Sequence, residues 1–200
     1  ERQERYNDTC ISFWKWHLEQ YQDFYAEVIT NEKCYGSAFI SRPYMDLADK
    51  SLSGKHFQNM KELFADRDIL IVEGFYSCSG VGNDLFQRAK SIERIICPSR
   101  NAYSKYEMIL DTIRQHGTDK LILLMLGPTA KVLAYDLAFE GFWAIDIGHV
   151  DSEYEWYKMG ATHKVKFQNK HTAEVNYDED IEVQKDDTYV KEIVAVLSEQ

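Results

Sequence analysis

The feature that most constrains this 200-residue chain is a set of four short apolar runs that alternate with helical patterns. Each run is about six residues long and rich in branched side chains, which is typical of strands buried on both faces. Strands and helices that alternate in this way form right-handed crossovers around a parallel sheet. We therefore expect an α/β, Rossmann-like fold, with strands at 68–73, 92–97, 121–126 and 142–147 and helices at 84–90, 102–113, 130–138 and 151–159.

The N-terminal segment has a different pattern. Apolar side chains recur there at intervals of three or four, which predicts a helix with one apolar stripe. Its aromatic content favours a core or an interface, so we expect that it forms a homodimer contact. An extended piece at 38–44, ended by Pro43, and a polar helix at 55–64 follow. The stripe consists of Trp14, Leu18, Tyr21, Tyr25 and Val28.

The C-terminal segment is predicted to be extended and polar at 163–185 and to close with a helix at 187–197. The apolar face of that helix is Val190, Ile193, Val194 and Leu197. A chain of this length forms one domain. We expect a single domain over residues 1–200, with a helical N-terminal part at 1–36, the Rossmann-like core at 38–160 and a C-terminal extension at 161–200.

The charge of the chain limits its partners. The formal net charge is −10, which argues against a general DNA or RNA binder. A phosphate-bearing small molecule is not excluded, because a helix N-terminus or a cation can hold an anion on an acidic protein. The longest apolar run, 121–126, is too short to span a bilayer. Four cysteines without a CxxC pair indicate free thiols and a reducing, cytoplasmic location.

Four loops follow the predicted strands, and each is rich in small or polar residues. Ligands of open parallel sheets bind beyond the carboxyl ends of the strands, so these loops are expected to converge on one site. The candidate residues are Gly80, Val81, Gly82, Asn83 and Asp84 after the first strand, Ser99, Arg100 and Asn101 after the second, and Gly127, Pro128 and Thr129 after the third, with Arg42 closing over the site.

The first of these loops contains Gly80 and Gly82 directly after a strand. Such glycines let the backbone approach a phosphate, and the following segment offers N–H groups. The loop is not a Walker A motif, and Leu85 stands where a dinucleotide fingerprint has its third glycine. A tight turn capped by Asn83 or Asp84 is the alternative, with roughly even odds.

The loop after the fourth strand holds two carboxylates, Asp151 and Glu153. In a turn or an extended segment both can reach one Mn²⁺ or Mg²⁺ ion, which would neutralise charge on a diphosphate leaving group. His149 is a candidate third ligand or hydrogen-bond donor. The alternative is that Asp151 caps the next helix and Glu153 favours its first turn, and the spacing alone prefers this by roughly two to one.

The other candidates have ordinary alternatives too. Arg100 is equally consistent with a solvated side chain beside a capping residue. The Gly127–Thr129 segment is consistent with simple helix-start chemistry, because proline favours the first helical position. An isolated arginine such as Arg42 usually lies at the surface.

Six stretches together resemble the GT-D glycosyltransferase domain in sequence, order and spacing. The likeness covers about residues 38–175, and its longest stretch, 146–156, is the most specific. Members commonly have an acidic Gly-Asp-Gly-Glu segment upstream and a basic residue near position 78, whereas this chain has Ser77-Cys78-Ser79-Gly80. The six stretches are 39–46, 68–74, 80–86, 95–99, 126–130 and 146–156.

The resemblance implies a Rossmann-like fold, a UDP-sugar donor and a divalent cation, typically manganese, bound through a DxE motif. In this sequence the motif is Asp151-Ser152-Glu153. It further implies transfer of a hexose to a glycan acceptor on a bacterial surface glycoprotein or polysaccharide, with UDP-glucose as the first donor to test.

Three functions therefore compete. The leading hypothesis is metal-dependent glycosyl transfer. The second is a non-catalytic domain that binds a nucleotide sugar and assembles partners, which the absent acidic segment favours and the intact motif disfavours. The third is a dinucleotide-dependent oxidoreductase, which the missing third glycine disfavours.

Overall fold

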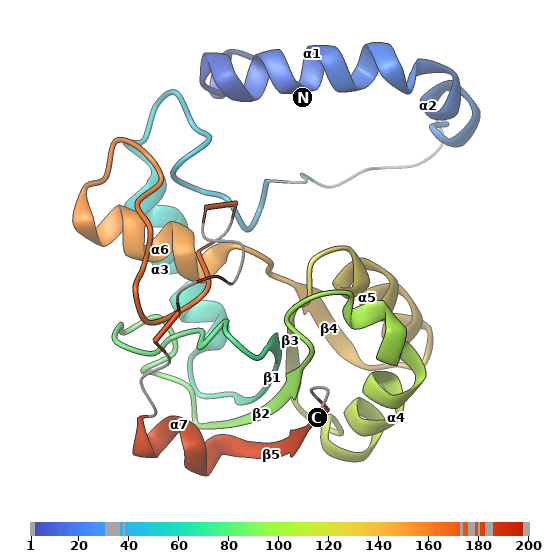
Figure 1. Cartoon of the computed structure of the whole chain (residues 1–200), viewed down its shortest axis with the longest axis vertical. Helices are drawn as coiled ribbons and strands as arrows, with labels where there is room; N and C mark the ends of the chain where they lie inside the picture. The colour runs from blue at the N-terminus through green and yellow to red at the C-terminus, as the bar shows by residue number, and fades with distance from the viewer. Residues whose placement is uncertain are drawn as a thin grey trace.

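The computed structural model of the chain describes residues 3–30, 37, 39–172, 174–175, 179, 181–182 and 186–197. A twisted sheet lies between two layers of helices, while the two N-terminal helices stand apart from these layers (Figure 1). The α/β fold expected from the alternating strands and helices is confirmed.

The sheet has the strand order β4-β3-β1-β2-β5, and every neighbouring pair is parallel. β1 is central, and its register with β2 runs from Asp68↔Ser91 to Gly74↔Cys97. The four predicted strands are confirmed, with ends that shift by a single residue at most. The strands are β1 (Asp68–Gly74), β2 (Ser91–Cys97), β3 (Leu121–Met125), β4 (Trp143–Asp146) and β5 (Ile193–Val196).

The two faces of the sheet bury alternate residues of the same strands. Ile69 and Ile71 of β1 belong to one core, together with residues of α3 (Ser53–Phe64) and α6 (Val150–Met159). Leu70 and Val72 belong to the other. That core contains residues of α4 (Tyr106–His116), which follows the 3₁₀ turn η2 (Ala102–Lys105), and of α5 (Pro128–Phe139). Full burial of each such side chain stabilises the fold by roughly 1.5–3 kcal/mol.

Two local predictions were wrong. Residues 84–90 form turns rather than a helix, because the chain there is held by short-range bonds such as Ala89 N–H to Phe86 O. The segment before α3 also turns rather than running extended, and Arg42 N–H donates to Phe39 O within it. Position 38 lies outside the described residues.

The closing helix predicted at 187–197 was also wrong. A short helix, α7 (Asp187–Glu192), is followed by β5, which pairs with β2. The run Ile193–Val196 is rich in β-branched side chains, which favour a strand over a helix when a sheet edge is available. Leu197 N–H extends the pairing by donating to Ile96 O at 2.6 Å. The described residues at 163–172 carry no helix or strand. Much of the rest of the extended stretch predicted at 163–185 lies outside the described residues.

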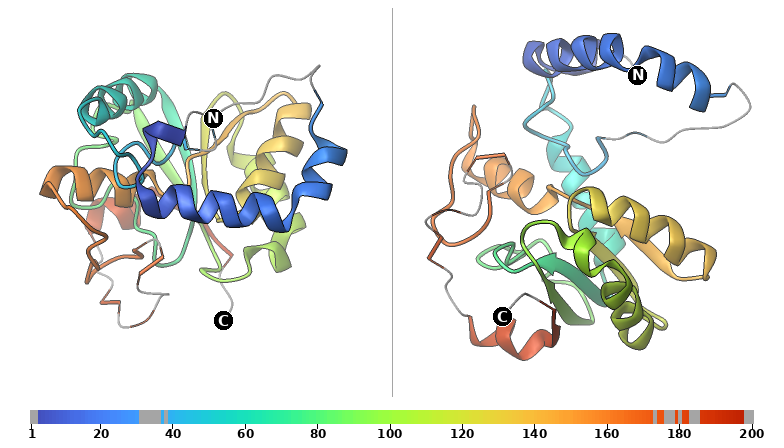
Figure 2. Two further views of the ribbon diagram at one scale, coloured as in Figure 1. Left: turned by 90° about the horizontal axis from the view of Figure 1, so that it is seen from above. Right: turned by 45° about the vertical axis from the view of Figure 1, so that its right-hand side comes forward.

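The predicted N-terminal helix is present as two helices, α1 (Asp8–Gln20) and α2 (Gln22–Val28), with a break at Tyr21. Both lie away from the sheet, as two further views show (Figure 2). Leu18, Tyr21 and Val28 of the predicted stripe are largely exposed, so the stripe does not form core. In the described part of the chain, no helix is both long and apolar enough to cross a membrane.

Candidate functional site

A cavity of about 510 Å³ opens at the carboxyl edge of the sheet. It lies near the carboxyl end of β1. The next two strands along the chain, β2 and β3, pair with opposite sides of β1, and open α/β sheets bind ligands at such a point. All four predicted loops contribute to its wall, so they do converge. The lining includes Gly74, Ser77 and Ser79 after β1, Pro98, Ser99 and Asn101 after β2, Gly127, Pro128 and Thr129 after β3, and Gly148, His149 and Asp151 after β4.

The N-terminus of α5 forms one wall of this cavity. Gly127 occupies the capping position with φ 55° and ψ −134°, a conformation that side chains with a Cβ adopt only with strain. Pro128 takes the first helical position, and among the described residues no side chain caps this helix start. The uncapped first turn therefore presents the positive end of the helix dipole to the cavity.

The glycine loop after β1 is fastened to α6. Gly80 has φ +83°, and its N–H donates to Asp151 Oδ1 at 2.8 Å. A Cβ at Gly80 would come within 2.6 Å of the Phe86 ring, so the loop passes close to that side chain. Asn83 Nδ2 donates to the same Asp151 oxygen at 2.9 Å. The loop is thus a structured wall rather than an open phosphate loop.

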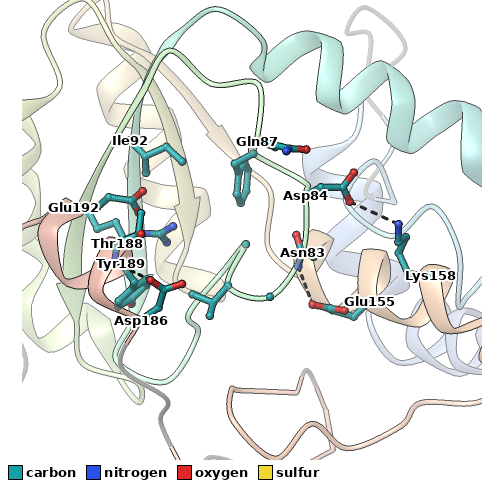
Figure 3. A pocket seen from close by; sticks show the side chains of 15 residues that line it. Asn83, Asp84, Gln87, Ile92, Glu155, Lys158, Asp186, Thr188, Tyr189 and Glu192 are labelled. Carbon is teal, nitrogen blue, oxygen red and sulfur yellow. Dashed lines mark hydrogen bonds and ion pairs between the residues drawn. The ribbon is translucent and has the colours of Figure 1, made fainter.

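The predicted residues of this loop face a second cavity, of about 600 Å³. Asn83 and Asp84 reach toward Glu155 and Lys158 of α6 there, and α7 forms the opposite side (Figure 3). Lys61 and then Tyr154 hydrogen-bond the carboxylate of Asp84 and lower its pKa to about 2. The residues Gly80, Val81, Gly82, Asn83 and Asp84 line this second cavity, which the loop separates from the first.

Asp151 lies in the wall of the first cavity with both carboxylate oxygens engaged. Oδ1 accepts the two hydrogen bonds from the glycine loop, and Oδ2 lies 2.8 Å from Lys170 Nζ. The side chains of Asp151 and Lys170 are almost fully buried, with 8% of Asp151 and 3% of Lys170 exposed. A buried carboxylate is stable only when it is paired and hydrogen-bonded, and Asp151 is both.

Glu153 is buried elsewhere. Its Oε2 accepts hydrogen bonds from the backbone N–H groups of Tyr44 at 2.9 Å and Met45 at 2.8 Å. Its other oxygen, Oε1, is buried and has no hydrogen-bond partner among the described residues. Burial raises the pKa of Glu153 to about 7, although the bond from the Met45 amide favours the charged form.

A shared cation does not fit Asp151 and Glu153 in this arrangement. α6 begins at Val150, so the two carboxylates lie two residues apart on a helix and do not face each other. Among the residues that the structure describes, no group of three or more His, Cys, Asp or Glu side chains could hold a metal ion. The Mn²⁺ or Mg²⁺ site at this pair stays a prediction from the motif.

His149 and Arg42 flank the start of α6. His149 lines the first cavity, and burial, followed by the positive charge of Arg42, lowers its pKa to about 4. The imidazole is therefore neutral at pH 7. Arg42 itself pairs with Asp46 at 3.2 Å and Glu174 at 2.6 Å and lines a separate hollow beneath α1. It acts on the site through its charge and not as part of the wall.

The comparisons with known proteins decide the family. The glycosyltransferase GT-D fold family matches residues 1–175 of the chain. The chain belongs to the GT-D family. The segment Asp151-Ser152-Glu153 lies in the first turn of α6, and Ser152 lines the first cavity.

Two relatives of this GT-D chain come from streptococci. It is 57% identical to a probable glycosyl transferase, Gly, of Streptococcus gordonii and 53% identical to the glycosyltransferase GlyD of Streptococcus pneumoniae serotype 4. The matches cover 98% and 96% of this chain but 29% and 23% of those proteins. The chain thus spans less than a third of the length of these relatives.

Solved structures agree with the fold. A structure described as showing that the highly conserved domain of unknown function 1792 has a distinct glycosyltransferase fold matches with a TM-score of 0.94 and 53% identity, over 98% of this chain and 71% of the other. A structure described as a new glycosyltransferase from Streptococcus sanguinis matches with a TM-score of 0.93 and 57% identity, over 97% and 72%.

The predicted site residues of this GT-D chain thus divide into groups. Ser99, Asn101, Gly127, Pro128, Thr129, His149 and Asp151 meet at the first cavity, whereas the residues 80–84 line the second. Arg100 is exposed and is not among the residues that line either cavity. Glu153 supports the backbone at 44–45.

Sequence reasoning missed several buried polar residues. Glu73 of β1 and Arg94 of β2 form an ion pair at 2.7 Å inside the sheet layer, with Arg94 also 2.7 Å from Glu192 of α7. The sequence signal for this pair was a charged residue inside each of two apolar runs, because a buried charge needs a partner. Lys170 and His171 come from the polar extension, whose sequence gives no pattern that points to the site.

Proposed function

We propose that the chain transfers a hexose from a UDP-sugar to a glycan acceptor on a surface glycoprotein or polysaccharide, in the cytoplasm, with UDP-glucose as the donor to test first. Membership of the GT-D family supports glycosyl transfer. The observation that carries the donor site is the cavity of about 510 Å³ at the carboxyl ends of the parallel strands. That position and size suit a nucleotide ligand.

The donor diphosphate is placed at the N-terminus of α5. The first turn after Gly127 has no side-chain cap among the described residues and offers a positive dipole end, which favours a phosphate group. Ser99 and Asn101 stand on the neighbouring wall with hydroxyl and amide groups suited to ribose or sugar hydroxyls. This placement leaves the side of the cavity near His149 for the transferred sugar.

His149 is assigned a hydrogen-bonding role toward a hydroxyl of the donor or the acceptor. A group with a pKa near 4 is a weak base at pH 7, so burial makes it a poor proton acceptor for catalysis. Asp84, with a pKa near 2, is weaker still and faces the other cavity. Glu153 has a suitable pKa but is turned toward the 44–45 backbone. The general base is therefore not assigned.

Release of UDP from UDP-glucose by the purified chain tests the proposal, with calorimetry reporting donor binding in the same samples. We expect Gly127→Ala to weaken donor binding by about tenfold or more, because the strained φ shifts the helix start. Gly141→Ala is the matched control, since Gly141 has φ +86° and open space around it but lies at the far end of α5. Equal effects of both variants would contradict the placement.

A non-catalytic role in donor binding or partner assembly is the second candidate. One observation favours it: both oxygens of Asp151 are already engaged by the chain itself, which is unusual for a group that should hold a reacting ion. Donor binding without UDP release, also after a panel of sugar acceptors is added, would favour this candidate over transfer.

A further inference from the structure

The side chain of Lys170 lies in the place where a cation would be expected. It comes from the segment after α6 and is 3% exposed. Its ammonium lies 2.8 Å from Asp151 Oδ2, 2.8 Å from Glu155 Oε1 and 3.2 Å from the carbonyl oxygen of Val81. Each of these three contacts is with an oxygen acceptor, as an ammonium group requires.

The two carboxylates around Lys170 belong to one face of α6. Asp151 and Glu155 are four residues apart, so they project to the same side of the helix, unlike Asp151 and Glu153. Asn83 joins the arrangement, because its Nδ2 lies 2.9 Å from Asp151 Oδ1. The same Nδ2 lies 2.8 Å from Glu155 Oε1, a contact drawn in Figure 3. One buried positive charge thus links the glycine loop, α6 and the C-terminal segment.

The atoms around the ammonium are the kind that a divalent ion selects. Two carboxylates and a backbone carbonyl are hard oxygen ligands, which Mg²⁺ and Mn²⁺ prefer over nitrogen or sulfur. An ammonium group and a divalent ion cannot occupy the same space, and the desolvated carboxylates need one of them. Occupation by Lys170 therefore excludes a metal from this oxygen of Asp151.

We propose that Lys170 is the built-in cation of this site and that a divalent ion reaches Asp151 only by displacing it. The pair that holds the cation is Asp151 with Glu155, while Glu153 anchors the 44–45 backbone. The inference concerns cation binding by the chain and deepens the proposed transfer, on which its functional meaning rests. Its test measures Mn²⁺ binding, which does not depend on transfer.

The first experiment compares Mn²⁺ binding to the wild-type chain and Lys170→Met by calorimetry, with thermal unfolding to show that the variant is folded. We expect Lys170→Met to bind Mn²⁺ about tenfold more tightly or better, the equivalent of about 1.4 kcal/mol. Adding Glu155→Gln should abolish the gain, whereas adding Glu153→Gln should retain it. Lys164→Met, whose partner is Glu174, is the matched control and should bind like the wild type.

A second measurement uses the wild-type chain alone, in case Lys170→Met does not fold. Acylation of lysines followed by mass spectrometry should find Lys170 protected, because it is 3% exposed, and Lys158 reactive, because it is 54% exposed. Mn²⁺ at saturation should raise the reactivity of Lys170 and leave that of Lys158 unchanged.

Two outcomes would overturn the proposal: Mn²⁺ binding that is equal in the wild type and Lys170→Met, and Mn²⁺ saturation that leaves Lys170 protected. UDP binding, measured without metal in the same samples, reports separately on the proposed function. If UDP binds and the metal results are negative, the built-in cation fails while the donor site stands. If UDP does not bind and Lys170 is displaced by Mn²⁺, the donor site fails while the built-in cation stands.

Discussion

Arg94→Met is expected to be one of the most destabilising single changes in the sheet. The Arg94 guanidinium lies 2.7 Å from Glu73 and 2.7 Å from Glu192, and it donates to the Ser79 carbonyl at 3.0 Å. Methionine has a similar length but no charge, so among the residues that the structure describes Glu73 would keep only the donors Ser79 N–H and Tyr189 Oη–H. Glu73 is completely buried, and its carboxylate would then lack a compensating charge.

Breaking a buried pair by removing one partner costs about 3–5 kcal/mol, because the remaining charge stays desolvated. With a urea slope of about 2 kcal/mol/M, this loss lowers the unfolding midpoint by about 1.5–2.5 M. Urea titration followed by circular dichroism measures the midpoint, and an unchanged slope would show that the folded and unfolded states keep their compactness.

Arg88→Met is the control, because Arg88 and its partner Glu62 are about half exposed. Exposed pairs of this kind contribute about 1 kcal/mol or less. Glu73→Gln combined with Arg94→Met should recover part of the loss, since the unpaired charge buried inside the sheet is removed, while Glu192 still lacks its partner. Equal midpoints for Arg94→Met and Arg88→Met would refute the reasoning.

Three further predictions concern other parts of the chain. Gly80→Ala should lower the thermal midpoint of unfolding more than Gly82→Ala. Both glycines have positive φ, but only at Gly80 does the new Cβ meet the Phe86 ring, at 2.6 Å. The additional loss of folding stability should be about 1–3 kcal/mol. Folded Glu153, with a pKa raised to about 7 from 4.5, holds its proton more tightly than the unfolded chain, so stability should fall as pH rises through this window. Glu153→Gln should flatten that part of the pH profile, measured by urea unfolding, and an unchanged profile would count against the burial argument. Trp16→Ser should abolish any dimer seen in analytical ultracentrifugation, because Trp16 is exposed on α1. Phe139→Ser, which changes an exposed residue of α5, should leave the dimer intact. A monomeric wild type would contradict the predicted dimer.

The core of the fold was predictable from sequence because its signals are local. β3 is a continuous apolar run buried along its whole length, and α5 begins at a proline that follows a glycine. These patterns specify strand or helix without knowledge of the partner. The carboxyl edge of the sheet then follows from topology, which is why Ser99, Thr129 and His149 could be placed at one edge, where they line the same cavity.

The sequence was less informative where tertiary contacts decide. Ile193 and Val194 fit a helical periodicity, but the open edge of β2 recruits them into a strand. The spacing of Asp151 and Glu153 suggested a shared ion only if the segment was a turn, and the observed helix sends them to different partners. The pairing of Lys170 with Asp151 joins residues 19 positions apart in a segment without periodicity, so no sequence pattern announces it.

Titration of UDP into the wild-type chain by calorimetry, with and without Mn²⁺, tests the central claim most directly. Binding that is saturable, that Gly127→Ala weakens and that Gly141→Ala leaves intact is the result predicted by a donor site at the carboxyl edge of the sheet. A folded wild-type chain that binds no UDP under either condition would contradict it.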